Sequence, residues 1–308
     1  MFKKVTESLK KCNNDGKLYL IEQLTEISGF FMCDGHLIYM VINDEGESSK
    51  CIETEFLKMN ADINVVSIKN NQHFASGKYN LIEFDEELDS SIENGDLDAF
   101  INLCLAHVKF MASKEFVKFF YSLIAIFQMP SEQQFKNLAG AFGELAFIKY
   151  FFITKGVDLS GDWHKTGSNS KYDISLKKCN IEIKTTVDAN KLVTIKHNQI
   201  FNNDKNFLAV VAIGETPSGI TYEELLDEML AAENYCNNYN FIVNVEKEKK
   251  RLSQNDMKNK RFNVQTVKMY DTLECCYFEN IPDNITSLSY KIDFSPIEQI
   301  EEDNWEFE

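Results

Sequence analysis

Two acidic side chains and a lysine are close together in the stretch 170–186, which has the pattern of a β-hairpin. Asp173 lies in the first of two runs in which apolar and polar residues alternate, and Glu182 and Lys184 lie in the second. Alternation with a period of two places the apolar set on one face of a sheet and the polar set on the other. Paired carboxylates are oxygen ligands of the kind that hard divalent cations take. This face therefore indicates either a metal site or an ordinary solvated surface.

The register of the hairpin decides which polar side chains meet. If residues 177–180 form a loop of four, Leu176 pairs with Ile181. Asp173 and Glu182 then become diagonal neighbours on one face, near enough to share a metal ion. An Asp followed further on by Glu-X-Lys is common by chance, so the interpretation depends on the elements around the hairpin.

The helix expected upstream, over 138–152, has a single acidic residue, Glu144. The neighbours of Glu144 at helical spacing are small or apolar, which is unusual for a glutamate on a surface. Gly140 and Gly143 precede it, and each glycine weakens a helix by about 1 kcal/mol relative to alanine. These features are explained if the helix packs closely against the hairpin. The alternative is an isolated glutamate at a helix edge.

Together these residues resemble the PD-(D/E)XK nuclease superfamily. Its core is a helix with an acidic residue, followed by a hairpin with Asp and Glu-X-Lys. Glu144, Asp173, Glu182 and Lys184 match those positions in order, and Tyr172 stands where the name of the superfamily has proline. The wider pattern is similar to bacterial PD-(D/E)XK motif proteins of restriction-like and phage-defence gene clusters.

The resemblance covers roughly residues 130–297. It implies an α/β (α+β) fold, with a restriction-endonuclease-like core of mixed β-sheet flanked by helices. It also implies that Asp173, Glu182 and the backbone carbonyl of Ile183 bind Mg²⁺ or Mn²⁺, while Glu144 holds a second ion or a water bound to the ion. Lys184 is expected to orient or help deprotonate the attacking water and to offset charge in the transition state.

Two further candidates follow the second strand of the hairpin. Gln199 stands where some of these nucleases have a glutamine that assists the site, although Asn203 replaces the tyrosine that often accompanies it. His197 is a candidate contact to phosphate. Trp163, in the loop before the hairpin, is expected to fill the core rather than to stack on a substrate.

The composition limits the class of protein. The chain has 308 residues and a net charge of −16, so nonspecific attachment to nucleic acid is not expected. Its longest apolar run is far too short to span a membrane, and because residues 1–7 have no apolar signal core, no signal peptide is expected. A cytoplasmic protein with no membrane contact is expected. The cysteines lack zinc-site spacing, so free thiols are expected in a reducing compartment.

The charge is unevenly distributed. Residues 247–261 hold seven basic and two acidic residues, among them Lys249, Lys250 and Arg251. Such a run is usually a solvated helix or loop. The alternative is an arm that contacts DNA phosphates beside the hairpin.

Four segments are expected. Residues 1–95 form a β-rich N-terminal unit, and 96–215 form a helical join and the nuclease core. Residues 216–297 form a C-terminal α/β extension of the core, read as strands from residue 240, and 298–308 form a poorly packed acidic tail. The helix with Glu144 is expected to begin at Ser131.

Three functions are compatible with these patterns. The first is a metal-dependent DNA endonuclease in a bacterial restriction-like anti-phage system, acting with other proteins of that system. The second is a catalytically silent module that keeps the fold and binds DNA or another defence protein. The third is a structural subunit whose hairpin charges are a solvated face. The partners compatible with these patterns are DNA, other proteins of the same defence system and a second copy of the chain. The patterns do not specify a recognition sequence or whether the chain acts alone.

Overall fold

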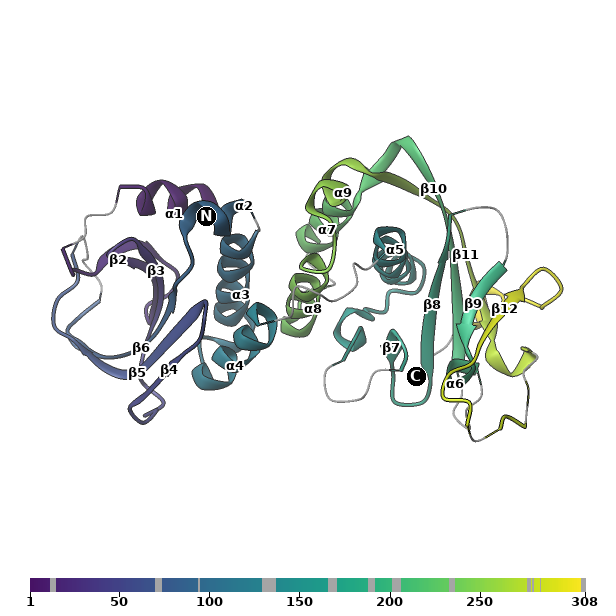
Figure 1. Cartoon of the computed structure of the whole chain (residues 1–308), viewed down its shortest axis with the longest axis horizontal. Coiled ribbons are helices and arrows are strands. Elements are labelled where there is room, and N and C mark those ends of the chain that lie inside the picture. The colour runs from purple at the N-terminus through teal and green to yellow at the C-terminus, as the bar shows by residue number, and fades with distance from the viewer. Residues whose placement is uncertain are drawn as a thin grey trace. The chain divides into compact units, whose positions relative to one another are not determined.

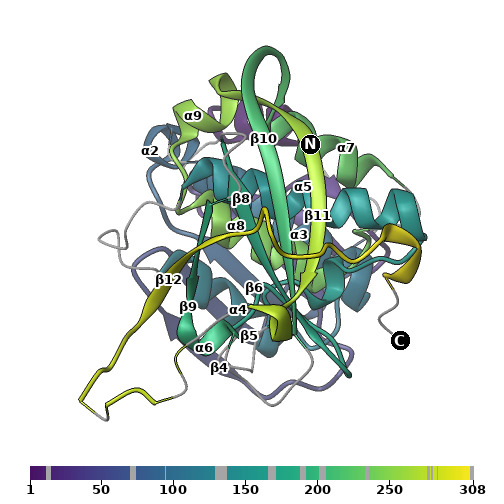
Figure 2. The same cartoon turned by 90° about the vertical axis from the view of Figure 1, so that its right-hand side faces the viewer.

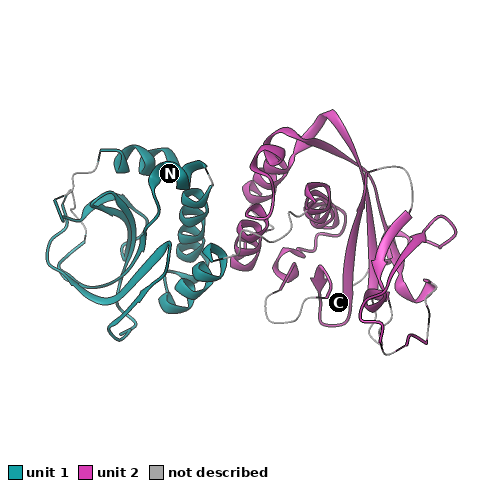
Figure 3. Cartoon of the chain, viewed as in Figure 1, with its two compact units in different colours: residues 1–133 teal, residues 134–308 magenta. Residues whose placement is uncertain are grey.

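The computed structural model describes two compact units. The first comprises residues 1–133 and the second residues 134–308 (Figure 3). Helices and strands are mixed in both units (Figure 1), which confirms the expected α/β (α+β) class. The structure describes residues 1–11, 15–69, 74–93, 95–128, 137–165, 171–187, 192–200, 206–232, 236–275, 278, 280–282 and 284–305.

The first unit contains a six-stranded antiparallel sheet with the strand order β1-β2-β3-β6-β5-β4. A turn at Asp34-Gly35 joins β2 to β3, with φ angles of 49° and 91°. Two positive φ angles are what the commonest two-residue hairpin turn requires. The strands of this sheet are β1 (Tyr19–Gln23), β2 (Ser28–Cys33), β3 (His36–Ile42), β4 (Lys50–Glu53), β5 (Leu57–Val65) and β6 (Gly77–Phe84).

Helices cover the sheet of the first unit. The ring of Tyr39 on β3 lies 5.9 Å from that of Phe119, and the ring of Phe84 on β6 lies 5.1 Å from that of Phe100. The helices over 96–128 therefore bury their apolar faces on the first sheet, rather than join the core as expected from a boundary after residue 95. The helices of this unit are α1 (Phe2–Leu9), α2 (Leu88–Glu93), α3 (Asp96–Met111) and α4 (Phe116–Phe127).

The second unit is built on a four-stranded sheet with the order β11-β10-β8-β7. Strand β10 pairs in parallel with β8 and antiparallel with β11, so the sheet is mixed, as expected. Figure 2 shows β10 and β11 running side by side over most of their length. The strands are β7 (Ile174–Ser175), β8 (Asn180–Thr186), β10 (Asn206–Thr221) and β11 (Arg261–Asp271).

Strand β10 is buried on both faces. Ala209 and Val211 belong to the core that includes helix α5 (Leu138–Lys155). Leu208 and Val210 belong to a second cluster with strand β9 (Leu192–Lys196) and the region of β12 (Ser289–Asp293). A strand covered on both sides has a continuous apolar run, and residues 207–213 form such a run.

The segment after β10 contains more helix than expected. Residues 239–249 form a helix and not a strand, because Asn238 caps them by accepting from the N–H of Phe241 at 2.8 Å. Phe241 and Val245 are buried one turn apart on this helix, so its β-branched residues follow a helical face. The helices after β9 are α6 (His197–Ile200), α7 (Tyr222–Ala231), α8 (Tyr239–Lys249) and α9 (Gln254–Asn259).

The acidic end of the chain packs against the core, which corrects the expectation of a loose tail. Trp305 is 3% exposed and its ring stacks on Phe151 at 6.1 Å. Its indole N–H donates to the carbonyl of Ile300, which in turn donates its N–H to Met269 of β11. None of the described helices is long and apolar enough to cross a membrane.

Candidate metal centre

The hairpin forms with a tighter turn than expected. Ile174 of β7 lies opposite Ile181 of β8, and the N–H of Leu176 donates to the carbonyl of Cys179 at 2.9 Å. The turn is therefore residues 177–178, and the expected pairing of Leu176 with Ile181 is wrong by two residues. A slip of two residues keeps every side chain on its face. The apolar set still faces the core, and the register brings Asp173 opposite Glu182.

Helix α5 approaches β8 closely at Gly143. A Cβ atom built on Gly143 would lie 2.0 Å from Oγ1 of Thr185, so any side chain there would clash. A Cβ atom on Gly140 would meet nothing within 4 Å, although the Gly140 carbonyl accepts from Thr185 Oγ1 at 3.4 Å. Close packing therefore explains Gly143 but not Gly140. It also fixes the position of Glu144 relative to β8.

The edge of β8 is open at the site because β7 contains only two residues. The N–H of Ile183, which a longer β7 could have paired, donates instead to Oδ2 of Asp173 at 2.7 Å. Asp173 therefore stands at the end of β7 with its carboxylate against the backbone of β8. Glu182 projects from that backbone beside it.

Glu144 is 7% exposed and its carboxylate is well hydrogen-bonded. Its Oε2 atom accepts from the indole N–H of Trp163 at 3.0 Å and lies 2.9 Å from Nε2 of His164. Trp163 is itself fully buried, so it fills the core as expected and also orients the acid. The backbone of Glu144 lies in α5, and its carboxylate contacts Trp163 and His164 in the loop that precedes the hairpin.

Burial and repulsion act together on the acids of the hairpin. The pKa of Asp173 is raised well above its usual range, first by desolvation and then by the carboxylates of Glu144 and Glu182. The N–H of Ile183 and the ammonium of Lys184 lower that pKa. Desolvation is also the largest cause that raises the pKa of Glu182. The three carboxylates are thus held close enough to repel one another in a desolvated place.

Glu182 has spare coordinating capacity. Its Oε1 atom forms an ion pair with Lys184, whereas its buried Oε2 atom has no hydrogen-bond partner within the described part of the chain. Gln199 is buried nearby and lowers the pKa of Glu182, but its amide also bonds to the backbone at Lys196 and Lys171. A buried carboxylate oxygen without a partner is costly unless a ligand completes it.

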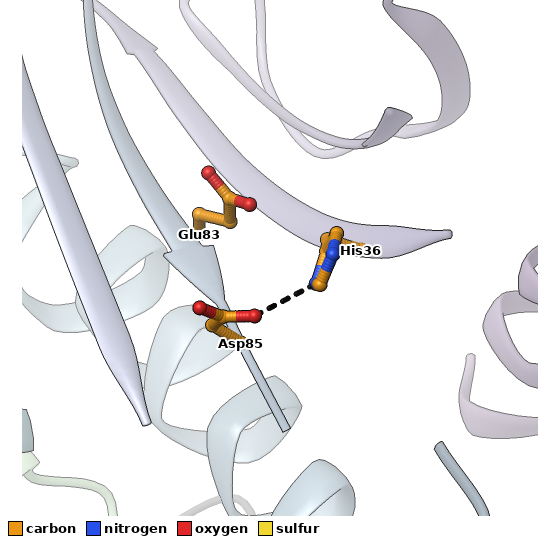
Figure 4. A group of neighbouring side chains, drawn as sticks. All are labelled: His36, Glu83 and Asp85. Carbon is orange, nitrogen blue, oxygen red and sulfur yellow. Dashed lines mark ion pairs between the residues drawn. The ribbon is translucent and has the colours of Figure 1, made fainter. Parts of the chain in front are cut away.

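Two groups in the described residues place three candidate ligand atoms within 4.8 Å of one another. The first comprises Glu144, His164 and Asp173 at the open edge of β8. The second comprises His36 on β3, Glu83 on β6 and Asp85 directly after β6, with a 3.2 Å ion pair between His36 and Asp85 (Figure 4).

Solvent access distinguishes the two groups. In the group of the first unit, the side chains of His36 and Asp85 are 37% and 45% exposed. Water can hydrate those groups without an ion. At the edge of β8, Glu144 is 7% exposed, His164 and Asp173 are partly buried, and the neighbouring Glu182 is 3% exposed. This less exposed group, together with Glu182 and Lys184, is therefore the candidate centre.

The other sequence candidates lie elsewhere. His197 begins α6 and its Nδ1 atom lies 2.6 Å from the hydroxyl of Tyr290, outside both groups. Lys249 and Lys250 lie at the end of α8, and Arg251 follows. The run 247–261 thus spans the end of α8, a turn, α9 and the start of β11, rather than an extended arm.

The basic side chains of this run face acidic partners. Lys249 lies 3.2 Å from Glu246, and Arg251 lies 3.7 Å from Glu248. Further along, Lys260 lies 2.8 Å from Asp256. Because Glu246 and Glu248 are each only 4% exposed, these contacts favour a packed helix end over a phosphate-binding arm.

Two residues that position the centre were not found from the sequence. His164 lies in a polar loop with no recognisable spacing to the acids, and only the folded chain brings it to Glu144. Asn244 donates to the carbonyl of Trp163 at 2.7 Å and to that of His164 at 3.3 Å, from a helix that the sequence suggested was a strand. Comparison with protein-family models, curated proteins and solved structures found no match to this chain.

Proposed function

We propose that this chain is a metal-dependent DNA endonuclease that hydrolyses phosphodiesters at the open edge of β8. The observation that supports this most strongly is the convergence of Glu144, Asp173 and Glu182 beside Lys184. Phosphodiester hydrolysis brings an anionic nucleophile to an anionic phosphate, and a divalent ion with a nearby ammonium meets that requirement. A bound ion supplies Lewis-acid chemistry and activates water there.

The residues present fit a divalent ion. The carboxylates of Glu144 and Glu182 both act on that of Asp173, and Lys184 forms an ion pair with Glu182. The Oε2 atom of Glu182 has no hydrogen-bond partner among the described residues, so it offers a ligand without breaking a bond there. Asp173 keeps one oxygen on the N–H of Ile183, which leaves its other oxygen for an ion. Mg²⁺ and Mn²⁺ both accept carboxylate oxygens and water.

The side chains of the centre divide the remaining work. The Lys184 ammonium, 26% exposed, reaches solvent from the buried strand β8 and can hold the attacking water or offset charge on the phosphate. Gln199 lies close enough to Glu182 to lower the pKa of its carboxyl, and backbone bonds hold the Gln199 amide in place. Trp163 and the N–H of Ile183 hold Glu144 and Asp173 in place, so the carboxylates are positioned before substrate arrives.

Association with DNA is expected to need a partner protein. The net charge is −16, and Lys249 and Arg251 are paired with acids of α8. Nonspecific affinity for DNA comes mainly from neutralisation of phosphates by Lys and Arg. A role within a multi-protein restriction-like defence system supplies that partner. The same acidic surface also favours the second candidate, a silent module that binds a partner protein.

The test is nicking of supercoiled DNA in Mg²⁺ or Mn²⁺, with and without the proteins encoded beside this chain. Native protein should nick, and Lys184→Ala should lower the rate by about 10²-fold or more, the scale for loss of one electrostatic or proton-transfer group. The matched control is Lys178→Ala, which removes an exposed lysine from the hairpin turn. Equal nicking by native protein and Lys184→Ala would show that a contaminant cuts the DNA.

A further inference from the structure

His164 is held at the centre in an unusual backbone conformation. Its φ angle is 45°, in the left-handed region that residues with a side chain rarely adopt. Its N–H donates to the carbonyl of Asp173 at 2.9 Å, and its own carbonyl accepts from Asn244 at 3.3 Å. A conformation of this kind persists where the surroundings fix it, and such residues concentrate at functional sites.

The ring of His164 points into the acidic group. Its Nε2 atom lies 2.9 Å from Oε2 of Glu144, and a ring nitrogen lies within 4.8 Å of carboxylate oxygens of both Glu144 and Asp173. The ring also packs on Trp163 with centroids 4.7 Å apart. The imidazole is therefore oriented by the core and is 26% exposed at the site.

We propose that His164 is a nitrogen ligand of the divalent ion, so that the centre takes Mn²⁺ or a related transition-metal ion in preference to Mg²⁺. The inference rests on the proposed metal centre and specifies its ligand set. A second observation supports an ion at this place. The carboxylate of Glu182 repels that of Asp173, and its buried Oε2 atom has no hydrogen-bond partner among the described residues.

The chemistry of the ligands sets the preference. Mg²⁺ is small and hard, keeps several waters and binds oxygen. Imidazole suits transition metals, and carboxylates suit Mn²⁺ as well as Mg²⁺. A group that combines two or three carboxylates with one imidazole therefore distinguishes the two ions through the nitrogen. The Nε2 atom of His164 lies 2.9 Å from Oε2 of Glu144, so the imidazole and this acid are already aimed at each other.

The alternative role for His164 is a hydrogen-bond partner that only neutralises Glu144. Both roles keep the imidazole beside the acid, so stability measurements do not separate them. Direct coordination is visible in the electron spin-echo envelope modulation of bound Mn²⁺, because a coordinated ¹⁴N nucleus modulates the echo. The protein must be purified without a histidine tag.

The variant His164→Asn is matched to this question. Asparagine tolerates a positive φ better than most residues, and its amide can still donate to Glu144. The native protein should show ¹⁴N modulation, and His164→Asn should lose it. The ratio of Mn²⁺ to Mg²⁺ affinity, measured by calorimetry, should fall by about tenfold or more, the scale of loss around a metal ligand.

The control variant is His36→Asn, because His36 belongs to the other group that could hold an ion. It should keep the modulation. Modulation that disappears in His36→Asn but persists in His164→Asn would overturn the inference, and so would Mn²⁺ bound without any ¹⁴N signal. Absence of Mn²⁺ binding would overturn both the inference and the metal centre.

Activity is measured separately on the same preparations. Nicking by native protein without ¹⁴N modulation would refute the ligand role of His164 and leave the nuclease proposal standing. Modulation without nicking, in the presence of the partner proteins, would refute the nuclease proposal and leave the ligand role of His164 standing.

Discussion

Removal of one charge from the centre should stabilise the protein when no metal is present. Asp173→Asn keeps an oxygen that can accept from the N–H of Ile183 and removes the negative charge. Carboxylate oxygens of Asp173 and Glu144 lie within 4.8 Å. Two unit charges at that distance repel by roughly 3 kcal/mol at an effective dielectric constant of about 20. The opposing effects of Ile183 and Lys184 reduce this to a net gain of about 2 kcal/mol.

The direction of the pH dependence follows from the raised pKa of Asp173. Between its ordinary value, near 3.8, and its raised value in the folded protein, the folded chain binds more protons than the unfolded chain. Stability therefore falls as the pH rises through this window. Asp173→Asn has no carboxyl to ionise at this position, so its stability does not fall in this window for this reason. Its advantage should be largest at alkaline pH and should shrink as the pH falls towards the ordinary pKa of an aspartate.

The assay is thermal unfolding in EDTA at pH 8 and pH 5, followed by addition of Mn²⁺. For a domain of 150–250 residues, about 2 kcal/mol corresponds to a rise of about 4–8 °C for the second unit at pH 8. Saturating Mn²⁺ should stabilise the native protein and reverse the order, because it binds only the chain with all its ligands. Asp227→Asn, at an exposed acid on α7, is the control and should change nothing.

A lower melting temperature for Asp173→Asn in EDTA at pH 8 would refute this reasoning. It would mean that the Asp173 carboxylate stabilises the folded chain by itself, as an ordinary structural acid does. An advantage that persists unchanged at pH 5 would also contradict it, because the repulsion should vanish once the carboxyl is protonated.

The other predictions concern packing and charge. Gly143→Ala should destabilise the second unit by about 1–3 kcal/mol because its Cβ would meet β8 at 2.0 Å, whereas Gly140→Ala should be neutral or stabilising by up to about 1 kcal/mol; chemical denaturation distinguishes them. Reversal of the three charges at 249–251 to Glu should leave DNA affinity almost unchanged in a titration at low salt, because two of them are already paired. The first unit should lose stability as the pH falls from about 6.5 towards 4. Burial lowers the pKa of His107 to about 4, so its folded form stays neutral while its unfolded form is protonated, and thermal unfolding of His107→Gln should show a weaker dependence.

The hairpin and its helix could be anticipated because their patterns are local. Alternation fixed the faces of 170–186, and the apolar surroundings of Glu144 indicated a buried helix. The turn was misjudged because a slip of two residues preserves the same alternation, so the pattern alone does not distinguish the two registers. The hydrogen bond from Leu176 to Cys179 closes a turn of two residues instead of four.

Other elements depend on contacts that are distant in the sequence. Strand β6 has a polar residue, Asn80, at a buried position, which alternation alone does not predict. Its side chain accepts from the N–H of Asp62 at 3.0 Å, where the register of β5 is irregular. Helix α8 was misjudged because its β-branched residues suit a strand, and the Asn238 cap decides otherwise. His164 reaches the centre through its partners Asp173 and Asn244.

The most direct test of the metal centre is anomalous diffraction from crystals grown or soaked with Mn²⁺. We expect an ion at the open edge of β8, within coordinating distance of Asp173 and Glu182, with the Oε2 atom of Glu182 as a ligand. Under the same conditions, crystals of Asp173→Ala should lack the peak. An ion found only at His36 and Asp85 would contradict the proposed metal centre. So would an edge of β8 that holds water but no ion at saturating Mn²⁺.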